Sequence, residues 1–213
     1  MPNEIETRLE STPVVPLIQA EDPQVAVATA RALLAGGLQV LEVVMRTSSA
    51  LDCVSRINAE LPDAIVGAGT VLNAAHAEAA AAAGARFLVS PGLDEGVVEH
   101  AAKKGLPVYP GVATATEAQR AWNMGLRTLK FFPASQAGGV SMIKSLASVF
   151  RDVRFMPTGG ISATNLPDYL ALPAVVACGG SWLTPPEAVA RGDFGAVTAL
   201  AREAVSIARQ ARP

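Results

Sequence analysis

A repeated strand–turn–helix pattern constrains the fold of this 213-residue chain more than any other sequence feature. Short β-branched runs are followed by Gly, Pro, Thr or Ser residues and then by alanine-rich amphipathic stretches, about every 20–25 residues, which indicates parallel strands joined by helices. The predicted strands are 14–18, 40–45, 65–70, 87–90, 108–112, 128–133, 154–158 and 175–178. The predicted helices are 23–35, 50–60, 74–83, 94–104, 116–124, 140–150, 163–170 and 194–211, with a short extra helix at 4–10.

Eight such units predict an α/β fold whose strands close into a (β/α)8 barrel, or TIM barrel, rather than an open doubly wound sheet. Glycines follow several of the predicted helices, as is common at helix C-termini. No linker or low-complexity segment divides the chain. We therefore expect one barrel domain over residues 1–213, with a short helix at its N-terminus.

Composition and charge argue against several kinds of partner. The net charge of −2 leaves no basic surface of the kind that nucleic-acid-binding proteins carry. No run approaches the ~18 apolar residues of a membrane span, and the polar, acidic start does not resemble a secretory signal. The two cysteines lack zinc-type spacing, and both histidines lie in predicted helices, so we expect no metal site. We expect a cytoplasmic protein that acts on a small molecule.

One lysine lies inside an apolar predicted strand. Lys130 belongs to the sequence Leu-Lys-Phe-Phe-Pro-Ala at 129–134, whereas the chain's other three lysines lie in predicted helices. Strand alternation places Lys130 and Phe132 on one face. Loss of solvation favours the neutral amine, which can form a Schiff base with a ketone or aldehyde. The alternative is a packed lysine stem whose charged end reaches water.

Glu42 is the only acidic residue inside the predicted apolar strands. Strand alternation places it on the same face as Val44 and Arg46. A buried carboxylate without a partner is costly, so Glu42 should be paired or neutral. Two interpretations follow: an acid/base group in an active site, or a structural ion pair with Arg46.

Gly-Gly pairs follow the last two predicted strands. Thr158 precedes Gly159 and Gly160, and a second pair that ends at Gly180 is followed by Ser181. Barrels often bind phosphate with the loops after strands 7 and 8. Backbone N–H groups of glycines and a serine hydroxyl can together hold an anion. These loops therefore favour a phosphate site over simple tight turns.

These motifs together resemble the 2-keto-3-deoxy-6-phosphogluconate (KDPG) aldolase family, which includes 4-hydroxy-2-oxoglutarate aldolases. The resemblance runs from Pro16 to Trp182. It implies a metal-independent class I aldolase on a (β/α)8 barrel that needs no cofactor and forms a homotrimer. The matching segments are 41–43, 46–47, 67–70, 90–92, 129–134, 157–161 and 179–182.

The resemblance also implies roles for individual residues. Lys130 resembles the Schiff-base lysine, and Glu42 resembles the general acid/base. The remaining residues resemble those that hold the pyruvoyl carboxylate (Arg46, Thr70), pack around it (Pro91, Phe132), are linked to the choice of the gluconate epimer (Thr158) and bind phosphate (Gly159, Gly160, Gly180, Ser181).

The implied reaction is cleavage of KDPG to pyruvate and glyceraldehyde 3-phosphate. A second implied substrate is 4-hydroxy-2-oxoglutarate, cleaved to pyruvate and glyoxylate. Four alternatives stay open at this point. They are an aldolase for the galactonate epimer of KDPG, an aldolase for unphosphorylated hydroxy-keto acids, a phosphosugar isomerase or epimerase, and a non-catalytic phosphosugar-binding barrel.

Overall fold

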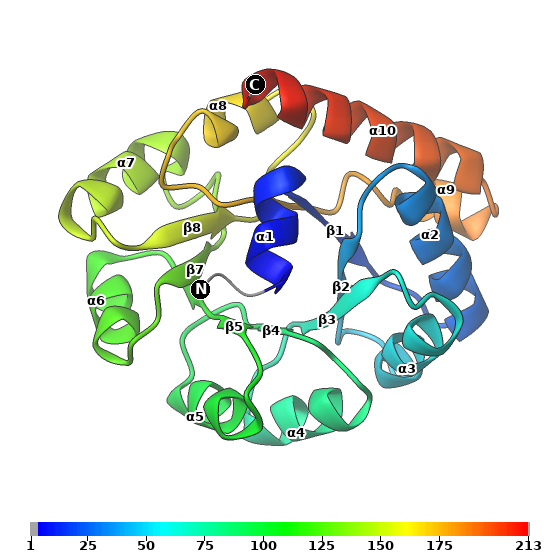
Figure 1. The fold of residues 1–213 in the computed structure, drawn as a ribbon, viewed down its shortest axis with the longest axis horizontal. Helices are drawn as coiled ribbons and strands as arrows, with labels where there is room; N and C mark the ends of the chain where they lie inside the picture. Colours follow the sequence, from blue (N-terminus) through cyan, green and yellow to red (C-terminus); the bar gives the residue numbers. More distant parts are fainter. Residues whose placement is uncertain (1–3, 213) are drawn as a thin grey trace.

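The computed structural model describes residues 4–212, so both ends of the predicted domain, residues 1–3 and 213, lie outside the described residues. Strands and helices alternate along most of the chain, and the helices after the first form an outer layer around the strands (Figure 1). The strands are β1 (Val14–Ile18), β2 (Val40–Val44), β3 (Ile65–Gly69), β4 (Leu88–Val89), β5 (Val108–Tyr109), β6 (Gly111–Val112), β7 (Thr128–Phe131), β8 (Arg154–Pro157) and β9 (Cys178–Gly180).

All the helices but the first surround these strands on the outside of the molecule. They are α1 (Glu4–Ser11), α2 (Pro23–Ala35), α3 (Ala50–Glu60), α4 (Ala74–Ala82), α5 (Glu95–Lys104), α6 (Ala115–Asn123), α7 (Gly139–Val149), α8 (Leu166–Leu170), α9 (Pro186–Ala190) and α10 (Phe194–Ala211). No helix within residues 4–212 is both long enough and apolar enough to cross a membrane.

The strand pairings are parallel and form two sheets. One curled sheet has the order β5-β4-β3-β2-β1-β9, and the other has the order β6-β7-β8. Two isolated parallel bridges, Phe155 with Val175 and Thr158 with Gly179, connect the region of β8 with that of β9. The parallel α/β fold predicted from the sequence is confirmed.

Several element boundaries differ from the predicted ones. The single strand predicted at 108–112 is divided into β5 and β6 by Pro110, which has no N–H to donate to a neighbouring strand. The strand predicted at 175–178 starts only at Cys178, and the helix predicted at 163–170 starts only at Leu166. Helix α9 was not predicted, because five residues are too short for a periodic pattern.

Apolar side chains fill the N-terminal end of the space inside the strands. Ile5 and Leu9 of α1 pack there with residues from several strands, including Tyr109 of β5, and with Phe87 just before β4. In Figure 1, α1 lies across the middle of the ring of strands and covers this end. Ion pairs from Glu4 to Arg86 and from Glu10 to Arg154 hold α1 against the strands.

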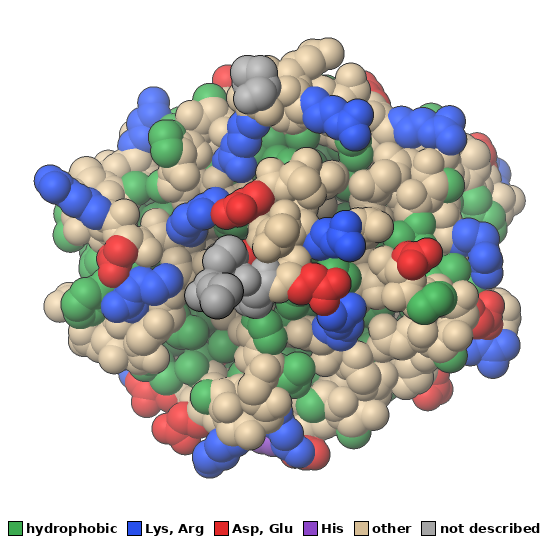
Figure 2. Space-filling model, viewed as in Figure 1, with side chains coloured by type: hydrophobic (Ala, Val, Ile, Leu, Met, Phe, Trp, Pro, Cys, Tyr) green, Lys and Arg blue, Asp and Glu red, His purple; other side chains and the backbone are tan. Residues whose placement is uncertain are grey.

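The same face carries no large patch of one charge. Figure 2 shows Lys and Arg side chains interspersed with Asp and Glu side chains over it.

The buried polar and charged side chains lie mostly within strands or just after them. They are Thr29, Glu42, Ser90, Lys130 and Thr158. Because the N-terminal end is apolar, we expect a functional site at the C-terminal ends of the strands, where barrel enzymes have theirs.

Candidate active site

Lys130 and Glu42 are in contact inside the molecule. Lys130 lies on β7 and Glu42 on β2, and Nζ of the lysine is 3.5 Å from Oε1 of the glutamate. Their side chains are only 6% and 1% exposed. The Lys130 amine also lies 5.3 Å from the centre of the Phe132 ring. A buried ion pair is tolerated when each charge satisfies the other, and here both groups can also exchange a proton.

A glycine on the neighbouring strand leaves room for the Glu42 carboxylate. Strands β2 and β3 pair in parallel, with Glu42 opposite Gly67 and Val44 opposite Gly69. A Cβ atom on Gly69 would overlap the carboxylate of Glu42. The glycine of the sequence motif at 67–70 therefore determines where the carboxylate can lie.

Arg46 pairs with Thr70 rather than with Glu42. Nε of Arg46 donates a hydrogen bond to Oγ1 of Thr70 over 3.3 Å. The structural ion pair between Glu42 and Arg46, one of the two interpretations of the sequence, is therefore wrong. Thr70 has a φ of +62°, which is rare for a β-branched residue and is the kind of backbone strain found at functional sites. The two residues implied to hold a carboxylate are thus side by side.

The loop after β8 presents two successive glycines in left-handed conformations. Gly159 has a φ of +97° and Gly160 a φ of +76°. Such turns direct successive N–H groups into a concavity that suits an anion. Ser135 and Asn165 fix the loop, because Oγ of Ser135 and Nδ2 of Asn165 both donate to the carbonyl of Gly160, over 3.1 and 2.8 Å.

Ser135 and Asn165 were not found by sequence reasoning. Each lies in a loop outside the quoted motifs. Nothing in their local sequence indicates which carbonyl they contact.

A cavity of about 130 Å³ is lined by Lys130, by Arg46 and by the glycines after β8 and in β9, whereas Glu42 and Thr70 are not part of its lining. Thr158 is buried beside Gly179, where a Cβ atom would overlap the threonine hydroxyl. The residues that line the cavity are Leu17, Arg46, Lys130, Phe132, Thr158, Gly159, Gly160, Ile161, Gly179, Gly180 and Ser181.

Pro91 is not among the residues that line this cavity. Its carbonyl instead packs against Gly111, where a Cβ atom would overlap it. Gly111 is paired with Lys130 between β6 and β7. Pro91 therefore lies close to β6, the strand that pairs with β7 at Lys130. The packing of Pro91 around a substrate stays a prediction.

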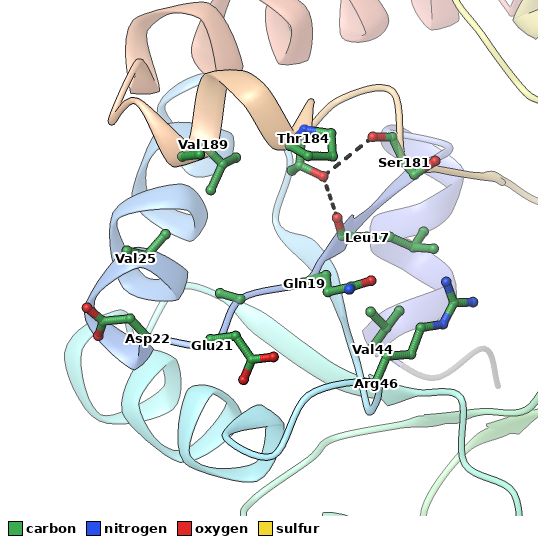
Figure 3. Close-up of a pocket in the computed structure, with 13 residues that line it drawn as sticks. Leu17, Gln19, Glu21, Asp22, Val25, Val44, Arg46, Ser181, Thr184 and Val189 are labelled. Atoms are coloured by element: carbon green, nitrogen blue, oxygen red, sulfur yellow. Dashed lines mark hydrogen bonds between the residues drawn. The ribbon is translucent and has the colours of Figure 1, made fainter.

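A second and larger cavity, of about 520 Å³, adjoins the first. Figure 3 shows it between α2 and α9, with Gln19 and Arg46 pointing toward each other at one side. Leu17, Arg46 and Ser181 line both cavities. The sequence analysis did not identify Gln19 or this space, because the cavity forms only where α9 packs near the start of α2.

The fold and this geometry define a class of site. A buried lysine amine in contact with a carboxylate, at the C-terminal ends of parallel strands, suits covalent chemistry on a carbonyl substrate. Within residues 4–212, no three His, Cys, Asp or Glu side chains are grouped so that they could hold a metal ion.

Comparisons with known proteins assign the family. Residues 5–200 match the family model described as KDPG and KHG aldolase. The chain is 46% identical to the 2-dehydro-3-deoxy-phosphogluconate aldolase of Treponema pallidum, over 93% of this chain and 95% of the relative. It is 47% identical to the KHG/KDPG aldolase of Escherichia coli K12, over 96% of both chains.

Two solved structures agree with this assignment. The KDPG aldolase of Zymomonas mobilis ZM4, solved with 3-phosphoglycerate, has a TM-score of 0.90 and 45% identity, with 96% of both chains covered. The KDPG aldolase of Legionella pneumophila, with pyruvate captured as a covalent carbinolamine, has a TM-score of 0.91 and 38% identity, with 95% of this chain and 98% of the other covered. The chain belongs to the KDPG and KHG aldolase family, and the predicted resemblance is confirmed.

Proposed function

We propose that this chain is a class I aldolase that cleaves KDPG to pyruvate and glyceraldehyde 3-phosphate through a Schiff base on Lys130. The observation that carries the proposal is the contact between buried Lys130 and Glu42, beside a cavity that also reaches the Gly-Gly loops. The covalent carbinolamine in the Legionella relative supports it. The name of the Escherichia coli relative, which includes both KHG and KDPG, supports 4-hydroxy-2-oxoglutarate as a second substrate.

The first step forms the imine. Glu42 lies 3.5 Å from the Lys130 amine and can take a proton from it. The neutral amine attacks the C2 ketone of KDPG and gives a carbinolamine. The proton on Glu42 then leaves with the carbinolamine hydroxyl as water, which restores the carboxylate and creates a protonated imine. That cation is the electron sink for the next step, so the mechanism needs no cofactor.

The second step breaks the C3–C4 bond. Glu42, directly or through a water molecule, removes the proton of the C4 hydroxyl. The electron pair of the C3–C4 bond moves into the imine, glyceraldehyde 3-phosphate leaves, and an enamine of pyruvate stays on Lys130. Glu42 then returns its proton to C3, and hydrolysis frees pyruvate. One carboxylate serves both transfers because it accepts and returns the same proton.

The remaining site residues grip the two ends of the substrate. Arg46, placed beside Thr70, supplies a charge-assisted bond to the substrate carboxylate. Backbone N–H groups of Gly159 and Gly160 after β8 and of Gly180 at the end of β9, with the hydroxyl of Ser181, bind the phosphate. Thr158 favours the gluconate epimer. The galactonate alternative has weaker support, because the structure titled native KDPGal is only 28% identical.

The two sheets together form one eight-stranded (β/α)8 barrel in this proposal, with β5 and β6 as halves of one strand. The hydrogen bond from the Lys130 N–H to the Pro110 carbonyl, over 2.9 Å, supports continuity between those halves. The bridges between Thr158 and Gly179 and between Phe155 and Val175 support closure at β9. Residues 4–212 then make up a single domain with α1 at its N-terminal end.

The family resemblance supports two further expectations, a cytoplasmic location and a homotrimer. Sedimentation in solution tests the second. A homotrimer gives a mass three times the 21.9 kDa of one chain. A species with the mass of one chain at micromolar concentration would contradict it.

Steady-state kinetics with KDPG test the assigned roles. Lys130→Met should abolish turnover, because the imine cannot form. Glu42→Gln should lower kcat by about 10²–10⁴, because proton transfer is lost while imine formation is partly kept. Lys144→Met, at an exposed lysine of α7, is the matched control and should keep wild-type turnover. Near-normal activity of Lys130→Met would refute the proposal.

A further inference from the structure

The cavity of about 520 Å³ beside the Lys130 site has no role in the reaction described above. It lies between the β1–α2 connection, the start of α2 and helix α9 (Figure 3). Leu17, Arg46 and Ser181 line both this cavity and the smaller one that contains Lys130. The two cavities are therefore adjacent, with Arg46 and Ser181 at the boundary between them.

Apolar side chains form most of the cavity wall. Val25 from α2, Val44 from β2 and Val189 from α9 line it, together with Leu17 and Pro186. Its volume falls within the range of about 300–1,000 Å³ that is usual for small-molecule pockets, which are also mainly apolar. The wall therefore suits a hydrocarbon group better than a phosphate.

Three polar side chains of the wall, those of Asp22, Arg46 and Thr184, have hydrogen-bond partners within the protein. Oγ1 of Thr184 donates to the carbonyl of Leu17 over 2.6 Å. Asp22 accepts from the N–H of Gln24 over 2.8 Å at the start of α2. An uncharged occupant leaves these bonds intact. The lining has two carboxylates, those of Glu21 and Asp22, against the one cation of Arg46, and this balance disfavours an anionic occupant.

We propose that this cavity, which we call the side cavity, binds the uncharged apolar tail of an aldehyde partner. It gives the chain a second substrate class, the aldol adducts of pyruvate with aldehydes that carry a tail about the size of a phenyl ring. This inference rests on the proposed function, because Lys130 forms the same imine. The C3–C4 bond breaks, its electron pair enters the imine, the hydroxyl proton passes to Glu42, and the apolar aldehyde leaves.

A matched pair of substrates tests the proposal. One is KDPG, and the other is 4,5-dihydroxy-2-oxo-6-phenylhexanoate, which has the same six-carbon backbone and hydroxyl groups, with phenyl in place of the phosphate group at C6. Val189→Phe fills the side cavity from α9, and Val25→Phe fills it from α2. Val149→Phe, at an exposed position of α7 outside the cavity lining, is the control for the added ring.

We expect the wild type to release pyruvate from both substrates. Val189→Phe and Val25→Phe should lower kcat/KM for the phenyl substrate by at least about tenfold, because the ring can no longer be buried. The same two variants should change kcat/KM for KDPG by less than about twofold. Their retained cleavage of KDPG would also show that both variants fold. Val149→Phe should change neither value.

Three outcomes would overturn the inference. In the first, the wild type cleaves KDPG but not the phenyl substrate. In the second, both filling variants leave kcat/KM for the phenyl substrate unchanged. In the third, both filling variants lower kcat/KM for the two substrates by the same factor. In each case KDPG cleavage by the wild type keeps the proposed function intact. If the wild type cleaves neither substrate, the proposed function fails and this inference fails with it.

Discussion

At the scale of residues, the position of the Glu42 carboxylate depends on Gly69. A Cβ atom at position 69 would overlap that carboxylate. Gly69→Ala should therefore displace Glu42 and lower kcat by about 10²-fold, the effect of misplacing a catalytic group by roughly 1 Å. Overpacking should also lower the free energy of unfolding by about 1–3 kcal/mol. Steady-state kinetics and urea unfolding measure the two effects.

Gly92→Ala is the matched control for this substitution. Gly92 follows β4 and is exposed, and a Cβ atom there would have no neighbour within 4 Å. Its kcat should stay within about twofold of the wild type. Equal activities of the Gly69→Ala and Gly92→Ala variants would show that the position of Glu42 does not depend on Gly69.

The sequence was sufficient to place Lys130 and Glu42 in buried strands, because a charged residue in an apolar run is visible locally. It did not show that the two side chains meet, since β2 and β7 are separated by 83 residues at their nearest ends. The strained backbone of Thr70 was also beyond sequence reasoning. Backbone strain of this kind follows from tertiary packing rather than from local preference.

At the scale of elements, the start of α6 has a capping box formed by Thr114 and Glu117. The N–H of Glu117 donates to Oγ1 of Thr114 over 3.3 Å, and Oε2 of Glu117 accepts from the N–H groups of Ala113 and Thr114 over 2.7 and 2.9 Å. Burial acts to raise the pKa of Glu117, but these hydrogen bonds outweigh it and lower the pKa below its usual range. The charged carboxylate therefore stabilises the folded state.

The sign of the pH dependence follows from this lowered pKa. Stabilisation by Glu117 is fully present above the unfolded pKa of about 4.3 and is lost as the pH falls through the lower folded pKa. Glu117→Gln should therefore lower the free energy of unfolding at pH 7, and this deficit should shrink below about pH 4. Chemical unfolding at a series of pH values measures it.

Thr116→Ala is the control within the same helical turn. Thr116 is exposed and is not part of the capping box. This substitution should change the free energy of unfolding by less than about 0.5 kcal/mol at either pH. A Glu117→Gln deficit that stayed constant from pH 7 to pH 3 would contradict the role of its charge.

Sequence reasoning found the helices more accurately than the strands. The bounds of α2, α3 and α10 agree with the predicted ones, because each helix has a periodic apolar face, and Asp22 and Asp193 cap the starts of α2 and α10. The break at Pro110 was missed because proline is also accepted at strand edges. Helix α9 was missed, and the cavity that it helps to form was missed with it.

At the scale of the whole molecule, both cysteines are buried in the core. Burial, reinforced by the nearby carboxylate of Asp52, raises the pKa of the Cys53 thiol to about 11. Burial also raises the pKa of Cys178 well above its usual range. Neither residue should carry a reactive thiolate at pH 8 while the chain is folded.

Thiol labelling with Ellman's reagent tests this expectation. Native protein at pH 8 should react only as fast as it unfolds, and both thiols should react at once in concentrated guanidinium. Rapid reaction of either thiol in the native protein would show that the core around it opens locally.

The central claim is that Lys130 forms a Schiff base, and trapping with borohydride tests it most directly. The protein is incubated with pyruvate, reduced with borohydride, and measured by intact and peptide mass spectrometry, with Lys130→Met treated in parallel. We expect one pyruvate-derived adduct per wild-type chain, on the peptide that contains Lys130, and none in the variant. A folded wild-type protein without the adduct, or with the adduct on another lysine, would contradict the account.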